Sequence, residues 1–373
     1  MKALSDRYRR TRELASENVL SPNIKLSART PVLWIVASVF FAPQLLAHHG
    51  AVTNGALYLT DEFIELEGEI TEVFWRNPHA RARISVVDDD GERTIWELEL
   101  GPGPRGFEAR GLYANDFVGR VRVAGYRSKR NPDSLGVLHV LLPGGQEYAQ
   151  GNREPLWADT RVANAVRELD PAKVAEARRT ANGVFRVWSR RLGGRPQPAD
   201  YGHLLSERGR ELFAEFDAVT DNPELECRTG MATSMLDPVP MEIIDEGDHI
   251  TIHLEEYDIR RTIYLDPDWS GVEPQGSPLG YSVGRWEGDT LVVTTTHIDW
   301  PYLDPYGTPQ SADVQYLERF ELSDDQTMLK YSLKATDPVM FTAPITMERQ
   351  RRWTPGVEIP PFNCVAEWER ATD

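Results

Sequence analysis

Short segments in which apolar and polar residues alternate constrain the fold of this chain more than any other feature of its sequence. The run 80–87 (ARARISVV) alternates strongly and ends at a turn-forming DDDG sequence. Because successive side chains of a strand point to opposite faces, such alternation predicts a strand with one buried face. Similar runs, separated by Gly, Pro, Asn and Asp, recur through most of the chain. The sequence therefore predicts a mainly β protein.

The first group of alternating runs predicts a small barrel. The expected strands are 62–74, 80–87, 94–100, 119–126 and 136–142. A Gly- and Pro-rich stretch separates the third strand from the fourth and predicts an irregular or helical connection there. Five strands with one such connection favour an OB-like five-stranded barrel.

The next group predicts a helical connector and a second barrel. Asp170-Pro171 and Ser206 each predict the start of a helix, because these residues cap and open helices well. The eight strands expected in the barrel are 184–189, 249–256, 259–265, 281–286, 290–297, 315–322, 328–335 and 345–353. Eight strands joined by short turns predict a lipocalin-like antiparallel β-barrel, which could hold one small ligand.

The predicted division of the chain has four parts. Residues 1–47 form a signal peptide or N-terminal anchor, and residues 48–147 form the OB-like domain. Residues 148–222 form the helical connector with the first barrel strand, and residues 223–373 form the barrel domain.

The N-terminal segment predicts export. Residues 31–47 are 17 uncharged residues that follow a basic stretch, which is the order of a secretory signal. The apolar segment is short for a membrane span, which needs about 20 residues, and Pro43 interrupts it. Two interpretations stay open, cleavage near Ala47 or retention as an inner-membrane anchor that faces the periplasm. Both place the body outside the cytoplasm, in the periplasm or the medium.

The cysteine content agrees with an exported protein. The chain has two cysteines, Cys227 and Cys364. In an oxidising compartment a disulfide between them is the default expectation. The alternative is a pair of buried free thiols.

The charge balance excludes some partners. The chain carries 41 basic and 58 acidic side chains, for a net charge of −17. Seven of the basic and three of the acidic residues lie in residues 1–30, so the body is more acidic than the whole chain. Such a body repels phosphate backbones and anionic membranes. We therefore expect a small-molecule ligand, no nucleic acid, and membrane contact only through residues 31–47 if they are not cleaved.

Three histidines predict a metal site. Cleavage after Ala47 would leave His48 as the first residue, whose α-amine and imidazole can chelate one ion. His79 would add a third nitrogen, and His49 is a further candidate. Nitrogen-rich ligation suits Cu(II), so copper is the expected cofactor. The alternative is that the histidine pair is an unstructured start and that His79 only hydrogen-bonds beside Pro78.

A second set of candidates lies in the predicted barrel. His297 and Asp299 are two residues apart, so on a strand they would face the same side, and a carboxylate can orient an imidazole for acid–base catalysis. Arg285, Trp286 and Tyr302 are candidate ligand-binding residues. The alternative is that Arg285 and Trp286 fix a hairpin turn and that Tyr302 belongs to a barrel-mouth loop.

Several motifs resemble a known family. They are AHHG at 47–50, LEG at 66–68, WRNPH at 75–79, GRWEGDTL at 284–291 and ERF at 318–320. This pattern resembles a bacterial family of exported proteins of unknown function, with an Ala-His-His mature start and a Trp-x-Asn-Pro-His motif. The second half is similar to its longer members, which carry a C-terminal β-domain. The resemblance implies export and two β-domains, and it implies no activity.

The sequence leaves three classes of function. The leading one is an exported protein that binds a small or hydrophobic ligand in the barrel, with copper binding at the mature N-terminus. The second is an envelope enzyme, a hydrolase, isomerase or cyclase, with its active site in the C-terminal barrel. The third is an interaction module. Whether the chain is an enzyme is left undecided by the sequence, and the barrel interior is expected to separate these classes.

Overall fold

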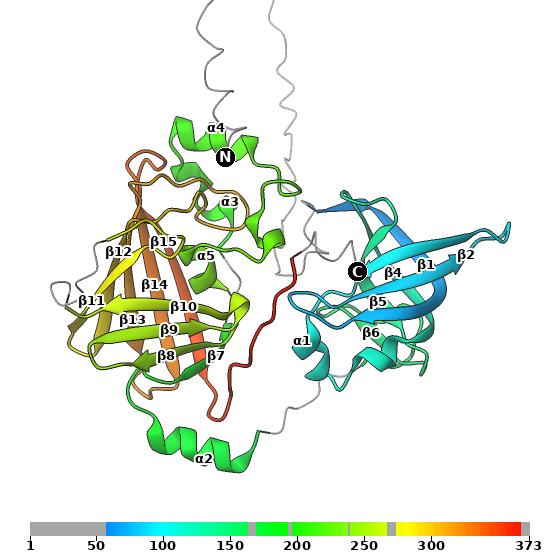
Figure 1. Cartoon of the computed structure of the whole chain (residues 1–373), viewed down its shortest axis with the longest axis horizontal. Helices are drawn as coiled ribbons and strands as arrows, with labels where there is room; N and C mark the ends of the chain where they lie inside the picture. The colour runs from blue at the N-terminus through cyan, green and yellow to red at the C-terminus, as the bar shows by residue number, and fades with distance from the viewer. Residues whose placement is uncertain (1–56, 163–168, 193–195, 238, 267–273, 367–373) are drawn as a thin grey trace, which may run out of the picture. The chain divides into compact units, whose positions relative to one another are not determined.

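The computed structural model describes residues 57–162, 169–192, 196–237, 239–266 and 274–366. All of them belong to one compact unit that spans residues 45–373. Two β structures follow one another along the chain (Figure 1). The prediction of a mainly β fold is therefore confirmed. The predicted segment 1–47 lies outside the described residues, and the predicted domain boundaries stay predictions.

The first β structure is an OB-like barrel. Its elements are β1 (Tyr58–Phe74), β2 (Arg81–Val87), β3 (Arg93–Glu99), α1 (Pro104–Glu108), η3 (Ala114–Phe117), β4 (Gly119–Ser128), β5 (Ser134–Leu141) and β6 (Glu147–Ala149). The sheet has the order β3-β2-β1-β4-β5-β6, and a parallel pairing of β3 with β5 closes the first five strands into a ring. The expected five strands and their helical connection are confirmed. The three-residue β6 was not predicted, because it is too short to show alternation.

Strand register in this barrel follows the alternation seen in the sequence. Ala82 and Ile84 of β2 are buried, and they lie opposite Leu98 and Trp96 of β3. The barrel also needs one residue without a side chain. A Cβ at Gly125 of β4 would lie 1.9 Å from the carbonyl oxygen of residue 136 on β5, so the two backbones approach too closely for any other residue.

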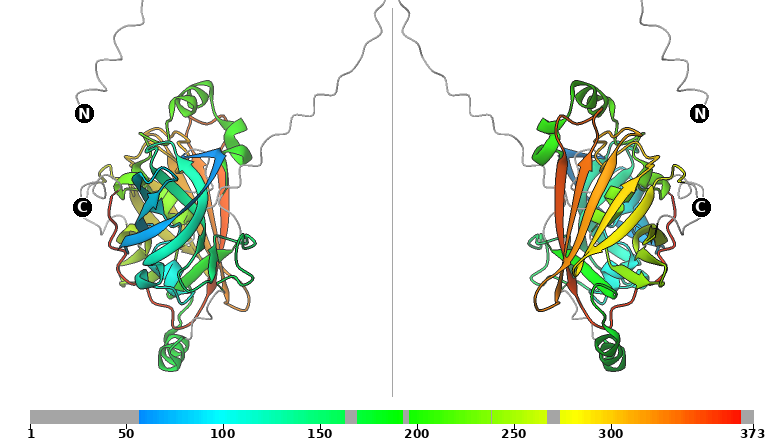
Figure 2. Two further views of the ribbon diagram at one scale, coloured as in Figure 1. Left: turned by 90° about the vertical axis from the view of Figure 1, so that its right-hand side faces the viewer. Right: turned by 90° about the vertical axis from the view of Figure 1, so that its left-hand side faces the viewer.

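The second β structure is a closed barrel of nine strands. They are β7 (Val187–Leu192), β8 (Met241–Asp245), β9 (His249–Leu254), β10 (Ile259–Tyr264), β11 (Tyr281–Glu287), β12 (Thr290–Thr296), β13 (Gln315–Leu322), β14 (Met328–Thr336) and β15 (Ile345–Trp353). Figure 2 shows β12 to β15 side by side on one wall. The predicted barrel is confirmed, but the expected eight strands omitted β8.

The lipocalin-like, wholly antiparallel connectivity needs a correction. β10 and β11 pair in parallel, with Ile263 opposite Ser282 and Tyr264 opposite Val283. Parallel neighbours need a connection of a dozen or more residues, and residues 265–280 provide one. The expectation was wrong because alternation predicts where strands lie, while it carries no information on their direction.

The helices surround and enter the second barrel. They are α2 (Pro171–Thr180), α3 (Pro198–Tyr201), η4 (Gly202–Leu204), α4 (Glu207–Glu215), η5 (Pro223–Glu226), α5 (Met231–Leu236) and η6 (Glu256–Asp258). Both predicted caps are confirmed: the side chain of Asp170 accepts from the Ala172 amide, and that of Ser206 accepts from the Gly209 amide. No helix among the described residues is long and apolar enough to cross a membrane.

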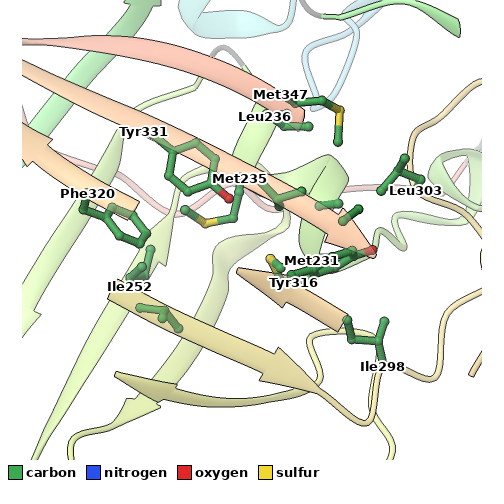
Figure 3. Close-up of a cluster of buried hydrophobic side chains, with 14 of the residues drawn as sticks. Met231, Met235, Leu236, Ile252, Ile298, Leu303, Tyr316, Phe320, Tyr331 and Met347 are labelled. Carbon is green, nitrogen blue, oxygen red and sulfur yellow. The ribbon is translucent and has the colours of Figure 1, made fainter. Parts of the chain in front are cut away.

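Side chains fill the described part of the barrel interior. All six residues of α5 are buried, and Met231 and Met235 lie among the large side chains of the strands (Figure 3). An ion pair lies in the same core: Arg261 donates to Glu318 over 2.8 Å, and the Tyr331 hydroxyl donates to the same carboxylate. Burial alone would lower the pKa of Arg261, but Glu318 outweighs this effect and raises it.

The predicted disulfide is confirmed. Cys227, which follows η5, is bonded to Cys364 near the end of the described chain, 137 residues away. The bond fixes Cys364, which belongs to residues 354–366, here called the C-terminal segment, beside the end of η5.

Candidate functional site

A cleft of about 500 Å³ opens beside two loops of the first barrel. These loops are residues 75–80, between β1 and β2, and residues 129–133, between β4 and β5. From the first barrel the polar lining includes Tyr58, Asn77, His79, Arg81, Glu97 and Glu99. The facing wall includes Glu224, Glu255, Glu256, Tyr257, Tyr306 and Phe362. The cleft therefore combines carboxylates, cations and aromatic rings.

Glu99 is a buried carboxylate in this lining, with 6% of its surface exposed. It accepts a hydrogen bond from the Tyr58 hydroxyl over 2.8 Å and one from the Arg81 guanidinium over 3.2 Å. Arg81 and Glu99 lie directly opposite each other in the β2–β3 ladder, so strand register brings the pair together. The guanidinium thus offsets the cost of burying this charge.

His79 contributes an imidazole to the cleft. Its Nδ1 atom is hydrogen-bonded to the carbonyl oxygen of Gly101 and lies 3.9 Å from Glu99. Gly101 has a φ of +98°, a conformation that favours glycine and that aims this carbonyl at the ring. Since a carbonyl only accepts, Nδ1 carries the proton in the neutral ring. Nε2 then keeps its lone pair, and it has no hydrogen-bond partner within the described ranges.

The C-terminal segment holds part of the facing wall. The amide of Phe362 donates to the Asp258 carboxylate over 3.0 Å, and the Phe362 ring packs edge-on against Tyr257. The backbone carbonyl oxygen of Phe362 accepts a hydrogen bond from the side-chain amide of Asn77. The Val365 amide donates to the Asn77 carbonyl over 3.1 Å. The conformation of loop 75–80 and the position of the C-terminal segment are therefore linked.

Ion pairs neutralise several charges in the lining. Arg81 pairs with Glu99, and Arg105 pairs with Glu255. An anionic ligand would have to compete with Glu99 or Glu255 for these guanidinium groups. Hydroxyl groups, in contrast, can donate to the carboxylates and accept from the guanidinium groups without separating them.

The structure describes one of the three predicted metal ligands. His48 and His49 lie outside the described residues, and His79 lies in the cleft with one ring nitrogen free to accept. Over the described ranges, no group of three or more His, Cys, Asp and Glu side chains is placed to hold a metal ion. Copper binding therefore stays a prediction that depends on the N-terminal histidines.

The strand interpretation of His297 and Asp299 was wrong. β12 ends at Thr296, and His297 has a φ of +55°, so the chain turns there and the two residues do not share a strand face. Both side chains are exposed, and the His297 ring shares a hydrogen bond with Thr296 over 2.9 Å. The catalytic role of this pair stays a prediction, but the shared strand face on which it rested is absent from the described structure.

The structure does not bring the candidate ligand-binding residues together. Arg285 pairs with Glu287 over 2.6 Å on the β11–β12 hairpin, and Trp286 packs edge-on against Phe185 there. Tyr302 lies beyond the other end of β12, a strand that is seven residues or about 23 Å long. Arg285 and Trp286 thus lie on the hairpin, as the alternative interpretation expected. Tyr302 packs against Phe216.

Sequence reasoning missed most of the cleft. The Trp-x-Asn-Pro-His motif contained Asn77 and His79, but Arg81 and Glu99 were seen only as strand residues, and Tyr58 lay outside the expected strands. The sequence carried no local signal for the burial of Glu99, because this residue lies on the polar face of β3, opposite the face that carries the inward-pointing Trp96 and Leu98.

The class defined by these observations is a mainly β protein with an OB-like barrel, a second closed barrel and a polar cleft. Residues 36–136, which are 101 of the 373 residues, match the model of a family of unknown function (DUF6152). The match includes both the AHHG run and the WRNPH motif. No curated protein matches the chain.

Proposed function

We propose that this protein binds a small, neutral, polyhydroxylated molecule in the cleft. The observation that carries the proposal is the buried Glu99, which pairs with Arg81 and lies 3.9 Å from Nδ1 of His79, whose Nε2 atom can accept a hydrogen bond. OB folds commonly bind oligosaccharides and oligonucleotides through strands 2 and 3 and through the loops that correspond to residues 75–80 and 129–133 here. This likeness is an analogy between folds, and the acidic body favours sugars over nucleic acids.

The size and lining of the cleft support a ligand of one or two sugar rings. Ligand pockets usually measure about 300–1,000 Å³, and this cleft measures about 500 Å³. Tyr257, Tyr306 and Phe362 supply aromatic surfaces for the apolar faces of a sugar, while the paired carboxylates and guanidinium groups can bond its hydroxyls. The interior of the second barrel, where the sequence placed a ligand, is filled by α5 and the strand side chains over its described part.

Binding can be tested with sugars that share one ring and differ in charge. Glucose, cellobiose, glucosamine and glucuronate would each be added to the full-length exported protein, and saturation-transfer NMR would measure contact and affinity. We expect the neutral sugars to bind more tightly than glucuronate, because its carboxylate must compete with Glu99 or Glu255 for a guanidinium group. Absence of saturation transfer to glucose and cellobiose, or tighter binding of glucuronate than of glucose, would contradict the proposal.

Substitutions locate the binding. His79→Ala and Glu97→Gln remove polar groups from the lining, and we expect each to weaken cellobiose binding about tenfold, which is about 1.4 kcal/mol. Arg120→Ala is the matched control, because Arg120 lies on the exposed surface of the same barrel and pairs only with Glu67. Equal losses in all three variants would place the sugar elsewhere.

We also propose copper binding by His48, His49 and His79, at the mature N-terminus of an exported protein. The hydrogen bond from Nδ1 of His79 to Gly101 supports this, because metal-binding histidines usually donate their second nitrogen to such a partner. The Cys227–Cys364 disulfide supports export, because disulfides persist in oxidising compartments.

The N-terminal sequence of protein recovered from its host tests the premise of this copper proposal. A chain that begins at His48 should bind one Cu(II) with a nitrogen-rich electron paramagnetic resonance spectrum. His79→Ala should change that spectrum and lower the affinity, whereas His249→Ala, on β9, should change neither. A mature chain that begins at another residue would rule out this chelate.

A further inference from the structure

A groove with a largely apolar floor lies where α2 crosses the second barrel. It has a volume of about 650 Å³. The ion pair of Lys173 with Glu358, and the contact of Val174 with Gly356, place the helix against the C-terminal segment. The apolar lining includes Ala177, Ala181, Phe185, Val187, Ile244 and Val357. No residue of α2 is fully buried, because this groove lies beneath the apolar face of the helix.

Arg186 borders the groove as a buried cation, with 8% of its surface exposed. Its guanidinium lies over the ring of Trp353, 4.4 Å from the centroid, and 5.4 Å from the centroid of Trp188. Two of its five N–H groups donate to Gln326, over 3.1 Å to the backbone carbonyl and 3.2 Å to the side chain. Both of these acceptors are neutral.

Within the described ranges, no carboxylate balances this charge. Arg186 forms no ion pair with any residue there, and its Nε atom is buried without a hydrogen-bond partner. Burial lowers its pKa, and no acidic group of the described chain raises it again. Arg261 shows the usual arrangement, because Glu318 compensates its more deeply buried charge. A buried charge without a compensating partner costs free energy. An anion that paired with this guanidinium would offset that cost.

The carboxylates at the rim do not fill this role. Glu358 pairs with Lys173 and Glu176 pairs with Arg179, each over 2.6 Å. Glu242 lies 4.0 Å from His253 on β9. Asp245 accepts from the Gly247 amide over 2.9 Å. Glu358, Glu176 and Asp245 therefore have partners of their own, while Glu242 is too far from His253 for a hydrogen bond. None of the four pairs with Arg186, so within the described residues its Nε edge is left for an anionic ligand.

We propose that this groove binds an anionic amphiphile, with its carboxylate on the guanidinium of Arg186 and its alkyl chain along the apolar floor beneath α2. A planar carboxylate matches the fork of N–H groups on one edge of a guanidinium. The apolar floor takes up the chain by the hydrophobic effect. This site is separate from the cleft and does not depend on the proposed sugar binding.

The test uses 2-bromododecanoate and its neutral counterpart, 2-bromododecan-1-ol, below their micelle concentrations, because a bromine next to the headgroup would lie near Trp353, on which Arg186 stacks. Bromine quenches tryptophan fluorescence, and Trp353 borders the groove. We expect the acid to quench the full-length protein and to bind at least tenfold more tightly than the alcohol. Arg186→Gln should remove this difference while leaving the binding of the alcohol unchanged.

Two helix variants provide a test that does not alter the buried arginine. Ala177→Trp fills the groove from α2 and should weaken binding of the acid at least tenfold. Ala175→Trp places the same side chain on the exposed face of the same helix and should leave binding unchanged. Failure of the acid to quench the wild-type protein, equal binding of acid and alcohol, or equal effects of the two tryptophans would each overturn the proposal.

Discussion

At the scale of single residues, Glu147 provides a test of how this fold buries charge. Its side chain is fully buried and accepts from the amides of Leu156, Trp157 and Ala158 and from the His139 ring. Burial alone would raise the pKa of Glu147, but the hydrogen bonds outweigh burial and lower it below 4.5. A carboxyl group with a depressed pKa stabilises the fold above its unfolded pKa, and this contribution is lost as the pH falls.

We therefore predict that Glu147→Gln destabilises the protein by about 1–3 kcal/mol at pH 7. The difference from wild type should shrink as the pH falls below about 4.5, because the unfolded wild-type chain then binds a proton that the folded carboxylate, with its lower pKa, does not yet bind. Urea unfolding at pH 7 and at pH 4 measures both quantities. Glu67→Gln, in an exposed pair with Arg120, is the control and should have little effect at either pH. A Glu147→Gln difference that grows on acidification would contradict this account.

The candidate site shows what a sequence can predict about single residues. His79 stood out because histidine beside Asn-Pro is a chemical signal that can be seen locally. Arg81 and Glu99 are 18 positions apart, and only the register of β2 against β3 brings them together. Register depends on which inward faces pack against each other, so the sequence alone did not predict the pair. His297 failed for a local reason, because its positive φ ends the strand that alternation had extended through it.

At the scale of elements, alternation predicted where most strands lie, but it did not predict every element or the direction in which neighbouring strands pair. The run 315–322 is recovered in full as β13, because its alternating residues lie on a half-buried surface. β8 was missed because its five residues lie between Pro240 and Gly247, in a stretch that is typical of a turn. The fully buried α5 was missed for the opposite reason. A helix buried on every side has no polar face and therefore no helical periodicity to detect.

At the scale of the whole molecule, one covalent bond ties the chain end to the cleft. The Cys227–Cys364 disulfide closes a loop of 137 residues. A bond of this span is expected to stabilise the fold by about 2–5 kcal/mol, since it restricts the unfolded chain. The paired substitution Cys227→Ser and Cys364→Ser should lower the free energy of unfolding by this amount. A reducing agent should lower that of the wild type similarly and leave the variant unchanged.

The same variant should separate the two proposed sites. Loss of the bond removes one of the restraints on Phe362, which lines the cleft, so cellobiose binding should weaken severalfold. Residues 354–358 keep their own contacts with α2, including the ion pair of Glu358 with Lys173, so binding of 2-bromododecanoate should change less than twofold. The two affinities would be measured on the same folded preparation below its unfolding temperature. Parallel losses of both would mean that the C-terminal segment acts as a single unit, while unchanged cellobiose binding would mean that Asp258 and Asn77 suffice to hold Phe362 in place.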